Sequence, residues 1–132
     1  MRLEGKIAVI TGAGSGIGLA ASQLFAAEGA TVLLLELNKE SGEKAKESII
    51  KNGGKAVFYQ VDISVLDEVE KAFKKIAEEF DGLDVLYNNA SVFWGNKDSA
   101  LEILDMDVFE KILRINLFGL AYCTKFAIPL LK

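Results

Sequence analysis

Short apolar runs alternate along the chain with longer segments of helical pattern. The runs at residues 7–11 and 31–36 are continuously apolar rather than alternating, which indicates strands covered on both faces, as in a parallel sheet. Residues 55–61 (KAVFYQV) and 83–87 (LDVLY) predict a third and a fourth strand. The pattern therefore predicts four short, buried strands.

Helical segments fill the spaces between these runs. Residues 19–28 and the Lys- and Glu-rich residues 38–51 predict two helices. Ser64, with Asp67 three positions later, is interpreted as a capping box that opens a third helix ending at Phe80. Strands that alternate with helices favour right-handed crossovers. We expect a Rossmann-type, doubly wound α/β fold with a parallel sheet in the strand order 3-2-1-4.

The last third of the chain changes character. Residues 91–104 predict an irregular loop around Trp94, and a helical pattern then runs from about Asp105 to Leu131. Charged residues interrupt the apolar part of this pattern, which argues against a membrane span. Residues 117–131 are apolar on more than one helical face, as at a subunit interface, so we expect a homo-oligomer. Without a linker or repeat, residues 1–132 form one expected domain.

Composition excludes several kinds of site and partner. The chain has no histidine and a single cysteine, Cys123, so imidazole catalysis, a Cys/His zinc site and an internal disulfide are excluded, and no metal is expected. A net charge of −4 argues against nucleic acid or an anionic membrane as partner. The first apolar run is too short for a signal peptide, and we expect a cytoplasmic protein.

The first candidate ligand-binding site is the sequence KIAVITGAGSGIG, where a predicted strand is followed by glycines at positions 12, 14, 16 and 18. Glycine permits positive φ and a closer approach of ligand or backbone than any Cβ would. The free N–H groups and the dipole of the following helix would hold a phosphate. A plain strand-to-helix turn is the alternative, and Ile17 stands where the G-x-G-x-x-G pattern has its third glycine.

Glu36 closes the second strand, eighteen residues after Gly18, where a dinucleotide site places the carboxylate that binds the adenosine ribose. A 2′-phosphate at this point would meet like charge, and the next residue, Leu37, offers no cation. The sequence therefore favours NAD over NADP. The alternative is a solvated acid at a strand end.

Polar residues also follow the third and fourth strands. Asp62 could accept a hydrogen bond from an adenine amino group or cap the next helix together with Ser64. Asn88 and Asn89 end the fourth strand, and buried amides there must find partners. They are therefore either turn stabilisers or ligand contacts.

Taken together, several motifs resemble the short-chain dehydrogenase/reductase family across essentially the whole chain. They are TGAGSGIG at residues 11–18, Glu36, VDI at 61–63, NNA at 88–90 and INLFG at 115–119. The resemblance implies an NAD cofactor and a small alcohol or carbonyl substrate. It implies a pyrophosphate over the loop that contains Gly12, Ser15, Gly16, Ile17 and Gly18, adenosine contacts at Glu36, Leu37, Asp62 and Ile63, contacts nearer the nicotinamide at Asn89, Ala90 and Ser91, and a catalytic helix asparagine at Asn116.

The chain departs from the family in two ways. Ser91 stands where the family has glycine, and its Cβ could crowd the nicotinamide ribose or shift the loop. The family's catalytic serine and Tyr-x-x-x-Lys pair lie beyond residue 132, and Tyr122 and Lys125 are three apart rather than four. We therefore expect the dinucleotide-binding, N-terminal half of an oxidoreductase, truncated before its catalytic segment. This chain should not be catalytically competent alone, and it should bind NAD more weakly than a complete enzyme does. A non-catalytic binding module and an assembly fragment without a ligand are the alternatives.

Overall fold

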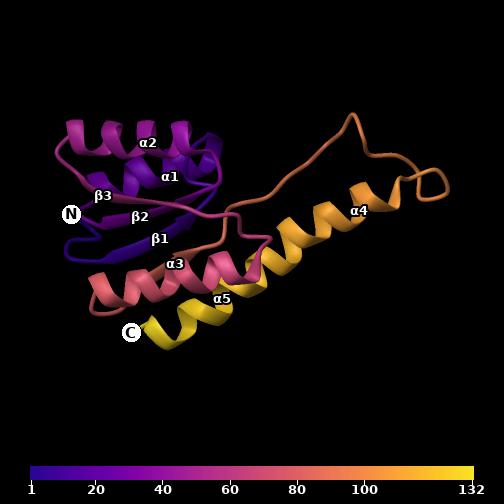
Figure 1. Ribbon diagram of the computed structural model, residues 1–132. Helices are drawn as coiled ribbons and strands as arrows, with labels where there is room; N and C mark the ends of the chain where they lie inside the picture. The colour runs from indigo at the N-terminus through magenta and orange to yellow at the C-terminus, as the bar shows by residue number, and fades with distance from the viewer.

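The computed structural model describes residues 1–132 and has a four-stranded parallel sheet at its centre (Figure 1). All neighbouring strands are parallel, and the order β3-β2-β1-β4 confirms the predicted fold class. In the register, Ile7 lies opposite Thr31 and Ala8 opposite Val85. The strands are β1 (Ile7–Thr11), β2 (Thr31–Glu36), β3 (Lys55–Gln60) and β4 (Val85–Tyr87).

Helices cover both faces of this sheet. In Figure 1, α1 and α2 lie on one face and α3 and α5 on the other. The long C-terminal helical region is continuous but not uniform, because a π-helical turn, η1, joins α4 to α5. The helical elements are α1 (Gly16–Ala27), α2 (Lys39–Lys51), α3 (Leu66–Glu79), α4 (Met106–Leu113), η1 (Arg114–Gly119), α5 (Leu120–Ala127) and the short 3₁₀ turn η2 (Ile128–Leu130).

The continuous apolar runs are explained by two separate cores. Successive strand residues point to opposite faces, so Leu34 packs with the residues under α1 and α2, whereas Leu33 and Leu35 pack with those under α3 and α5. Both faces of the sheet are shielded from water by helices, which is why apolar and polar residues do not alternate along β2. None of the helices is long and apolar enough to cross a membrane.

Cys123 lies fully buried on the inner side of α5. Burial raises the pKa of its thiol to about 12, because the thiolate would lose its hydration. The thiol is therefore neutral at physiological pH and plays a packing role.

The predicted capping box at the start of the third helix is wrong. The hydroxyl of Ser64 donates to Asp62 Oδ1 at 2.6 Å, and the Ser64 N–H donates to the same oxygen. Ser64 is thus engaged in a turn with Asp62. The helix begins at Leu66 without a side-chain cap and ends at Glu79.

The fourth strand is shorter than predicted. Leu83 precedes it and forms a parallel bridge with Leu131 on the outer side of the sheet. The Leu83 N–H donates to Leu130 O at 2.7 Å, and the Lys132 N–H donates to Leu83 O at 3.0 Å. Residues 85–87 pair only with β1, so β4 is an edge strand of the sheet.

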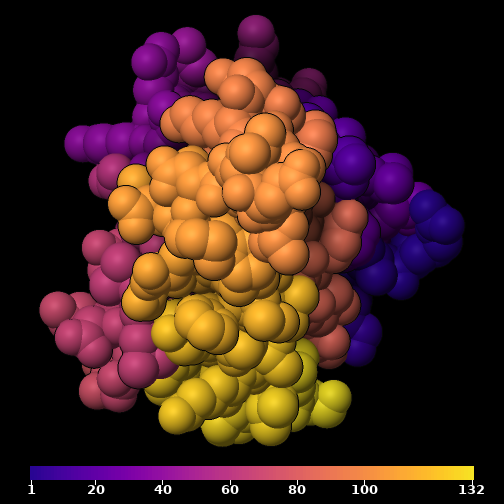
Figure 2. Space-filling view, turned by 90° about the vertical axis from the view of Figure 1, so that its right-hand side faces the viewer, coloured from indigo at the N-terminus to yellow at the C-terminus, as the bar shows by residue number.

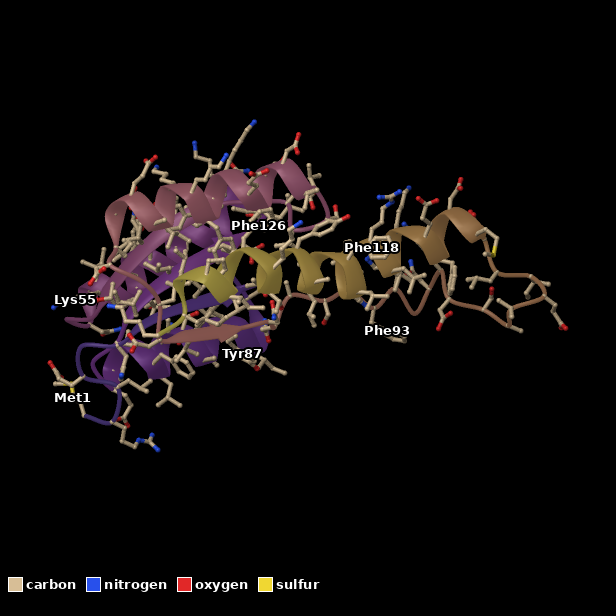
Figure 3. The ribbon with its side chains drawn as sticks, turned by 90° about the horizontal axis from the view of Figure 1, so that it is seen from below. Met1, Lys55, Tyr87, Phe93, Phe118 and Phe126 are labelled. Atoms are coloured by element: carbon tan, nitrogen blue, oxygen red, sulfur yellow. The ribbon has the colours of Figure 1, made fainter.

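Residues 92–113, which we call the arm, comprise an irregular segment and α4. The arm extends beyond the sheet in Figure 1 and stands in front of the rest of the chain in Figure 2. Phe93, labelled in Figure 3, is 82% exposed. The predicted loop around Trp94 contains no helix or strand. The other large exposed apolar side chains of the arm are Leu101, Ile103, Met106 and Phe109.

We expect acid to abolish the stabilisation that Asp84 provides. Its carboxylate accepts from Lys6 Nζ at 2.8 Å and from the Ile7 N–H at 2.9 Å, which lowers the pKa of Asp84. A carboxylate with a lowered pKa in the folded state stabilises that state above its unfolded pKa of about 3.9 and loses the effect as pH falls through the folded value.

Urea unfolding of the parent chain and of Asp84→Asn measures this effect. The parent chain should be more stable at neutral pH, and the difference should shrink as pH falls through the lowered pKa of Asp84 and vanish once its carboxyl group is protonated in both states. A difference that persists in acid would contradict the assignment to ionisation.

Candidate functional site

A cavity of about 390 Å³ opens at the carboxyl ends of the strands. Its wall is built from the turn between β1 and α1, the ends of β2 and β3, the segment after β4 and one residue of η1, Ile115. In an open α/β sheet this edge, at the point where the strand order reverses, is where ligands bind.

The glycines of the first turn have distinct structural reasons. Gly12 has φ +63°, and a Cβ there would lie 2.9 Å from the Ala90 Cα. A Cβ on Gly18 would overlap the carbonyl oxygen of Gly12 and lie 2.6 Å from Asn89 Nδ2. Glycine at these positions therefore allows α1 and the end of β4 to close on the turn.

The cavity wall at Gly16 is not packed against other residues of the chain. Gly16 has φ +52° and has nothing within 4 Å of the place a Cβ would take. The N–H groups of Ser15, Gly16 and Ile17 make no hydrogen bond within the chain. Unpaired N–H groups at the positive end of a helix dipole suit a phosphate.

Glu36 lies at the β2 end of the cavity. Its carboxylate accepts from the Gly14 N–H at 2.9 Å and from the Asn38 N–H at 3.1 Å. These bonds hold the acid beside the glycine turn. Leu37 is also in the wall, and no lysine or arginine is.

Asp62 contributes from the end of β3. Its Oδ1 accepts both the N–H and the hydroxyl of Ser64, whereas its Oδ2 makes no hydrogen bond within the chain. The Asp62 N–H donates to Glu68 Oε2 at 2.8 Å. One carboxylate oxygen of Asp62 thus remains available to a ligand.

Sequence reasoning missed the role of Thr11, which is 1% exposed. Its hydroxyl oxygen accepts from the Asn89 N–H at 3.1 Å and from the Ala90 N–H at 2.9 Å. In return, Asn89 Nδ2 donates to Thr11 O at 3.1 Å and to Gly12 O at 3.4 Å. The segment after β4 is therefore fastened to the glycine turn.

Asn88 faces a different neighbour. Its Nδ2 donates to Thr124 Oγ1 of α5 at 3.0 Å. Its Oδ1 is buried without a hydrogen-bond partner. This bond joins the end of β4 to α5, which is neither of the two predicted roles, a turn contact or a ligand contact.

Asn116 lies in η1, outside the wall of the cavity. Its Oδ1 accepts from the Val92 N–H at 2.8 Å, and its Nδ2 donates to Val92 O at 2.9 Å. Asn116 thus fixes the start of the arm. No sequence pattern on the arm indicates this pair of bonds.

The structure brings most of the predicted site residues together. Gly18 lies beneath the turn and Asn116 behind Val92, so neither lines the cavity. A role in binding stays a prediction for all of them. Nowhere do three His, Cys, Asp or Glu side chains gather as a metal would require. The predicted residues in the wall are Gly12, Ser15, Gly16, Ile17, Glu36, Leu37, Asp62, Ile63, Asn89, Ala90 and Ser91; the others there are Leu35, Val61, Val92 and Ile115.

We expect Asn116→Ala to loosen the arm. The change removes two partly buried hydrogen bonds, and each is worth about 0.5–1.5 kcal/mol of the free energy of unfolding. Hydrogen exchange should become faster at the Val92 amide. Asn96→Ala is the matched control, because Asn96 is exposed on the same arm and makes no hydrogen bond. Equal exchange at Val92 in the two variants would contradict this role.

The chain has a Rossmann-type α/β fold with a cavity at the strand ends, and comparisons with known proteins give the family. The short chain dehydrogenase family model matches residues 6–132. The chain therefore belongs to the short-chain dehydrogenase family of oxidoreductases.

Individual relatives agree with this assignment. The meso-2,3-butanediol dehydrogenase of Serratia marcescens is 40% identical over 129 residues, which are 98% of this chain and 49% of that protein. The crystal structure of an NAD⁺-bound xylitol dehydrogenase matches with a TM-score of 0.90 and 30% identity, over 98% of this chain and 49% of the other. A short-chain dehydrogenase/reductase mutant from S. marcescens has a TM-score of 0.93 at 26% identity, over 100% and 53%. The chain spans about half the length of the curated relatives it matches.

Proposed function

We propose that this chain binds NAD in the cavity at the carboxyl ends of β1 to β4. One observation carries the proposal: the unpaired N–H groups of Ser15, Gly16 and Ile17 and the carboxylate of Glu36 share one wall. The amides suit a diphosphate and the carboxylate suits the two hydroxyls of a ribose. The NAD⁺-bound relative supports the same kind of ligand.

The charges in the cavity support NAD rather than NADP. Two like charges about 4 Å apart repel by on the order of 4 kcal/mol at an effective dielectric constant near 20. A 2′-phosphate beside Glu36 would meet this repulsion. No lysine or arginine lines the cavity to offset it.

We further propose that the chain serves an oxidoreductase that transfers hydride between NAD(H) and a small alcohol or carbonyl compound, and that it is not competent alone. Reduction of a carbonyl needs a proton donor at the substrate oxygen. No tyrosine or lysine lines the cavity. Dinucleotide binding and turnover should therefore separate in this chain.

Calorimetric titration of the purified chain with NAD, NADP and AMP tests the proposal. We expect heat of binding with NAD and AMP and a weaker response to NADP. Absorbance of NADH in the presence of aldehydes or ketones should not change. Absence of heat and of any rise in melting temperature with NAD and AMP would overturn NAD binding, and NADH oxidation would overturn the lack of turnover.

We also propose that the chain forms a homo-oligomer through η1, α5 and the start of η2. Leu117, Phe118, Leu120 and Ile128 are all exposed, although the opposite side of α5 packs in the core through Cys123. Figure 3 shows Phe118 where the arm joins α5.

Leu117→Glu should shift this oligomer toward monomer, because it places a charge in a desolvated contact. Light scattering after size exclusion measures the mass. Glu110→Gln, on the neighbouring α4, is the control and should leave the mass unchanged. A monomeric parent chain at every concentration would contradict the proposed assembly.

A further inference from the structure

Asn52 and Gly53 lie in the turn that joins α2 to β3, at the amino ends of the strands and thus opposite the cavity. Among the asparagines of the chain, only Asn52 precedes a glycine, and both residues are exposed. In such a pair the backbone nitrogen of the glycine can attack the side-chain amide carbon of the asparagine, because glycine has no side chain to shield that nitrogen. The sequence of this turn therefore favours deamidation of Asn52.

The fold holds the pair in a geometry that opposes this reaction. The Gly53 N–H donates to Ile50 O at 2.9 Å, and Asn52 Nδ2 donates to Ser48 O at 2.9 Å. Asn52 has a ψ of 13°, so the Gly53 nitrogen is nearly eclipsed with the Asn52 nitrogen and is turned away from Cβ. Attack on Asn52 Cγ therefore requires rotation about the Cα–C bond, and the hydrogen bonds that hold this turn must break first.

Ile49 fastens the last turn of α2 to the rest of the molecule. Its side chain is buried in the core under α1 and α2. Its carbonyl oxygen accepts from the Gly54 N–H at 3.0 Å and from the Asn52 N–H at 3.2 Å. Helix ends open locally at a lower free energy than the whole domain unfolds. The last turn can therefore open while the sheet stays intact, and this opening exposes Ile49.

We propose that Asn52 is a site of spontaneous deamidation that the fold protects and that reacts when the last turn of α2 opens. In the reaction a bond forms between the Gly53 nitrogen and Asn52 Cγ. The bond from Cγ to Nδ2 breaks, and Nδ2 leaves as ammonia with the proton that the Gly53 nitrogen gives up. Water then opens the cyclic imide at either of its carbonyl groups, which gives aspartate or isoaspartate at position 52.

The product should disfavour closure of the turn. An aspartate at this position has no N–H to donate to Ser48 O, and its charge lies at the C-terminus of α2, where the helix dipole is also negative. Asn52→Asp should raise the equilibrium constant for unfolding in urea about tenfold. Asn96→Asp makes the same change of charge on the exposed arm and should leave this constant nearly unchanged. Equal stability of Asn52→Asp and the parent chain would overturn the role of the Asn52 side chain in closing the turn.

Mass spectrometry of the peptide that contains residues 52 and 53 measures the reaction after incubation of the full chain at a fixed, slightly alkaline pH. We expect deamidation to be at least about tenfold slower in the folded chain than in the chain unfolded by urea, because two hydrogen bonds must break first. Asn52→Gln should show no gain of mass in this peptide, since its longer side chain would have to close a larger ring. Equal rates in the folded and the unfolded chain would overturn the protection.

Two conservative variants show which opening admits the reaction. Ile49→Val and Ile76→Val each remove one buried methyl group, from α2 and from α3, so both should lower the global stability by similar amounts. Ile49→Val should speed deamidation of the folded chain about 2- to 10-fold, whereas Ile76→Val should leave the rate unchanged. Equal acceleration by both variants would overturn local opening in favour of global unfolding. An unchanged rate in Ile49→Val would also overturn it.

Discussion

Glu36→Gln is expected to reduce the preference for NAD over NADP at least tenfold. The change removes the charge that would repel a 2′-phosphate, a term on the order of 4 kcal/mol before screening. It also weakens the hydrogen bonds to the ribose, since bonds to a charged group are worth about 1.5–3 kcal/mol. NAD should bind more weakly and NADP more tightly.

Glutamine is a sharper choice than alanine at this position. Its side-chain oxygen can still accept from the Gly14 N–H, which Glu36 holds at 2.9 Å, so the glycine turn keeps its support. Competitive titration with the two dinucleotides measures the ratio of affinities. Glu40→Gln changes the net charge equally on exposed α2, outside the cavity, and should leave the ratio unchanged. If Glu36→Gln leaves the ratio of affinities unchanged, the proposed contact between the Glu36 carboxylate and the ribose is contradicted.

Gly18→Ala should have the largest effect on stability and binding together. A Cβ at this position would overlap Gly12 O and lie 2.6 Å from Asn89 Nδ2. Neither neighbour can move freely, because Gly12 belongs to the glycine turn and Asn89 is hydrogen-bonded to it. Overpacking of this kind costs about 1–3 kcal/mol. The start of α1 must move away from the turn, so NAD affinity should also fall at least tenfold.

Urea unfolding and calorimetric titration measure these two effects. Gly53→Ala is the matched control: Gly53 has φ +81° but has open space around the place of a Cβ, in a turn remote from the cavity. It should lose stability through backbone strain alone and keep its affinity for NAD. Equal affinities in Gly18→Ala and the parent chain would contradict the close packing of turn and helix.

The sequence predicted the fold well where one local signal decided the structure. The run TVLLLE is apolar from Val32 to Leu35 because both faces of β2 are buried there, and its predicted bounds are those observed. Prediction failed where a residue bonded to another partner than the one expected, either distant in the chain or two residues away. Leu83 pairs with Leu131 rather than extending β4, and Ser64 bonds to Asp62 instead of capping a helix. The π turn at η1 was not predicted either, because the apolar pattern of this region indicates only a helix and does not distinguish a π turn from an α-helix.

For the candidate site, the sequence predicted which residues would meet but not how they are held. The ends of parallel strands share one edge, so Glu36, Asp62 and Asn89 had to lie near the glycine turn. The bonds from Thr11 to residues 89 and 90, and from Asn116 to Val92, join segments far apart in the chain. A threonine inside an apolar run carries no sign that its hydroxyl will accept two such bonds.

The buried hydroxyl of Thr11 also bears on how a ligand would enter. It ties the segment after β4 to the first turn through bonds made entirely within the chain. The glycine turn and the segment after β4, which form the two sides of the cavity mouth, are thus held in position before a ligand binds. Capture of a nucleotide should then proceed as a simple bimolecular collision, without a slow rearrangement afterwards, because little conformational entropy is left to lose at that mouth.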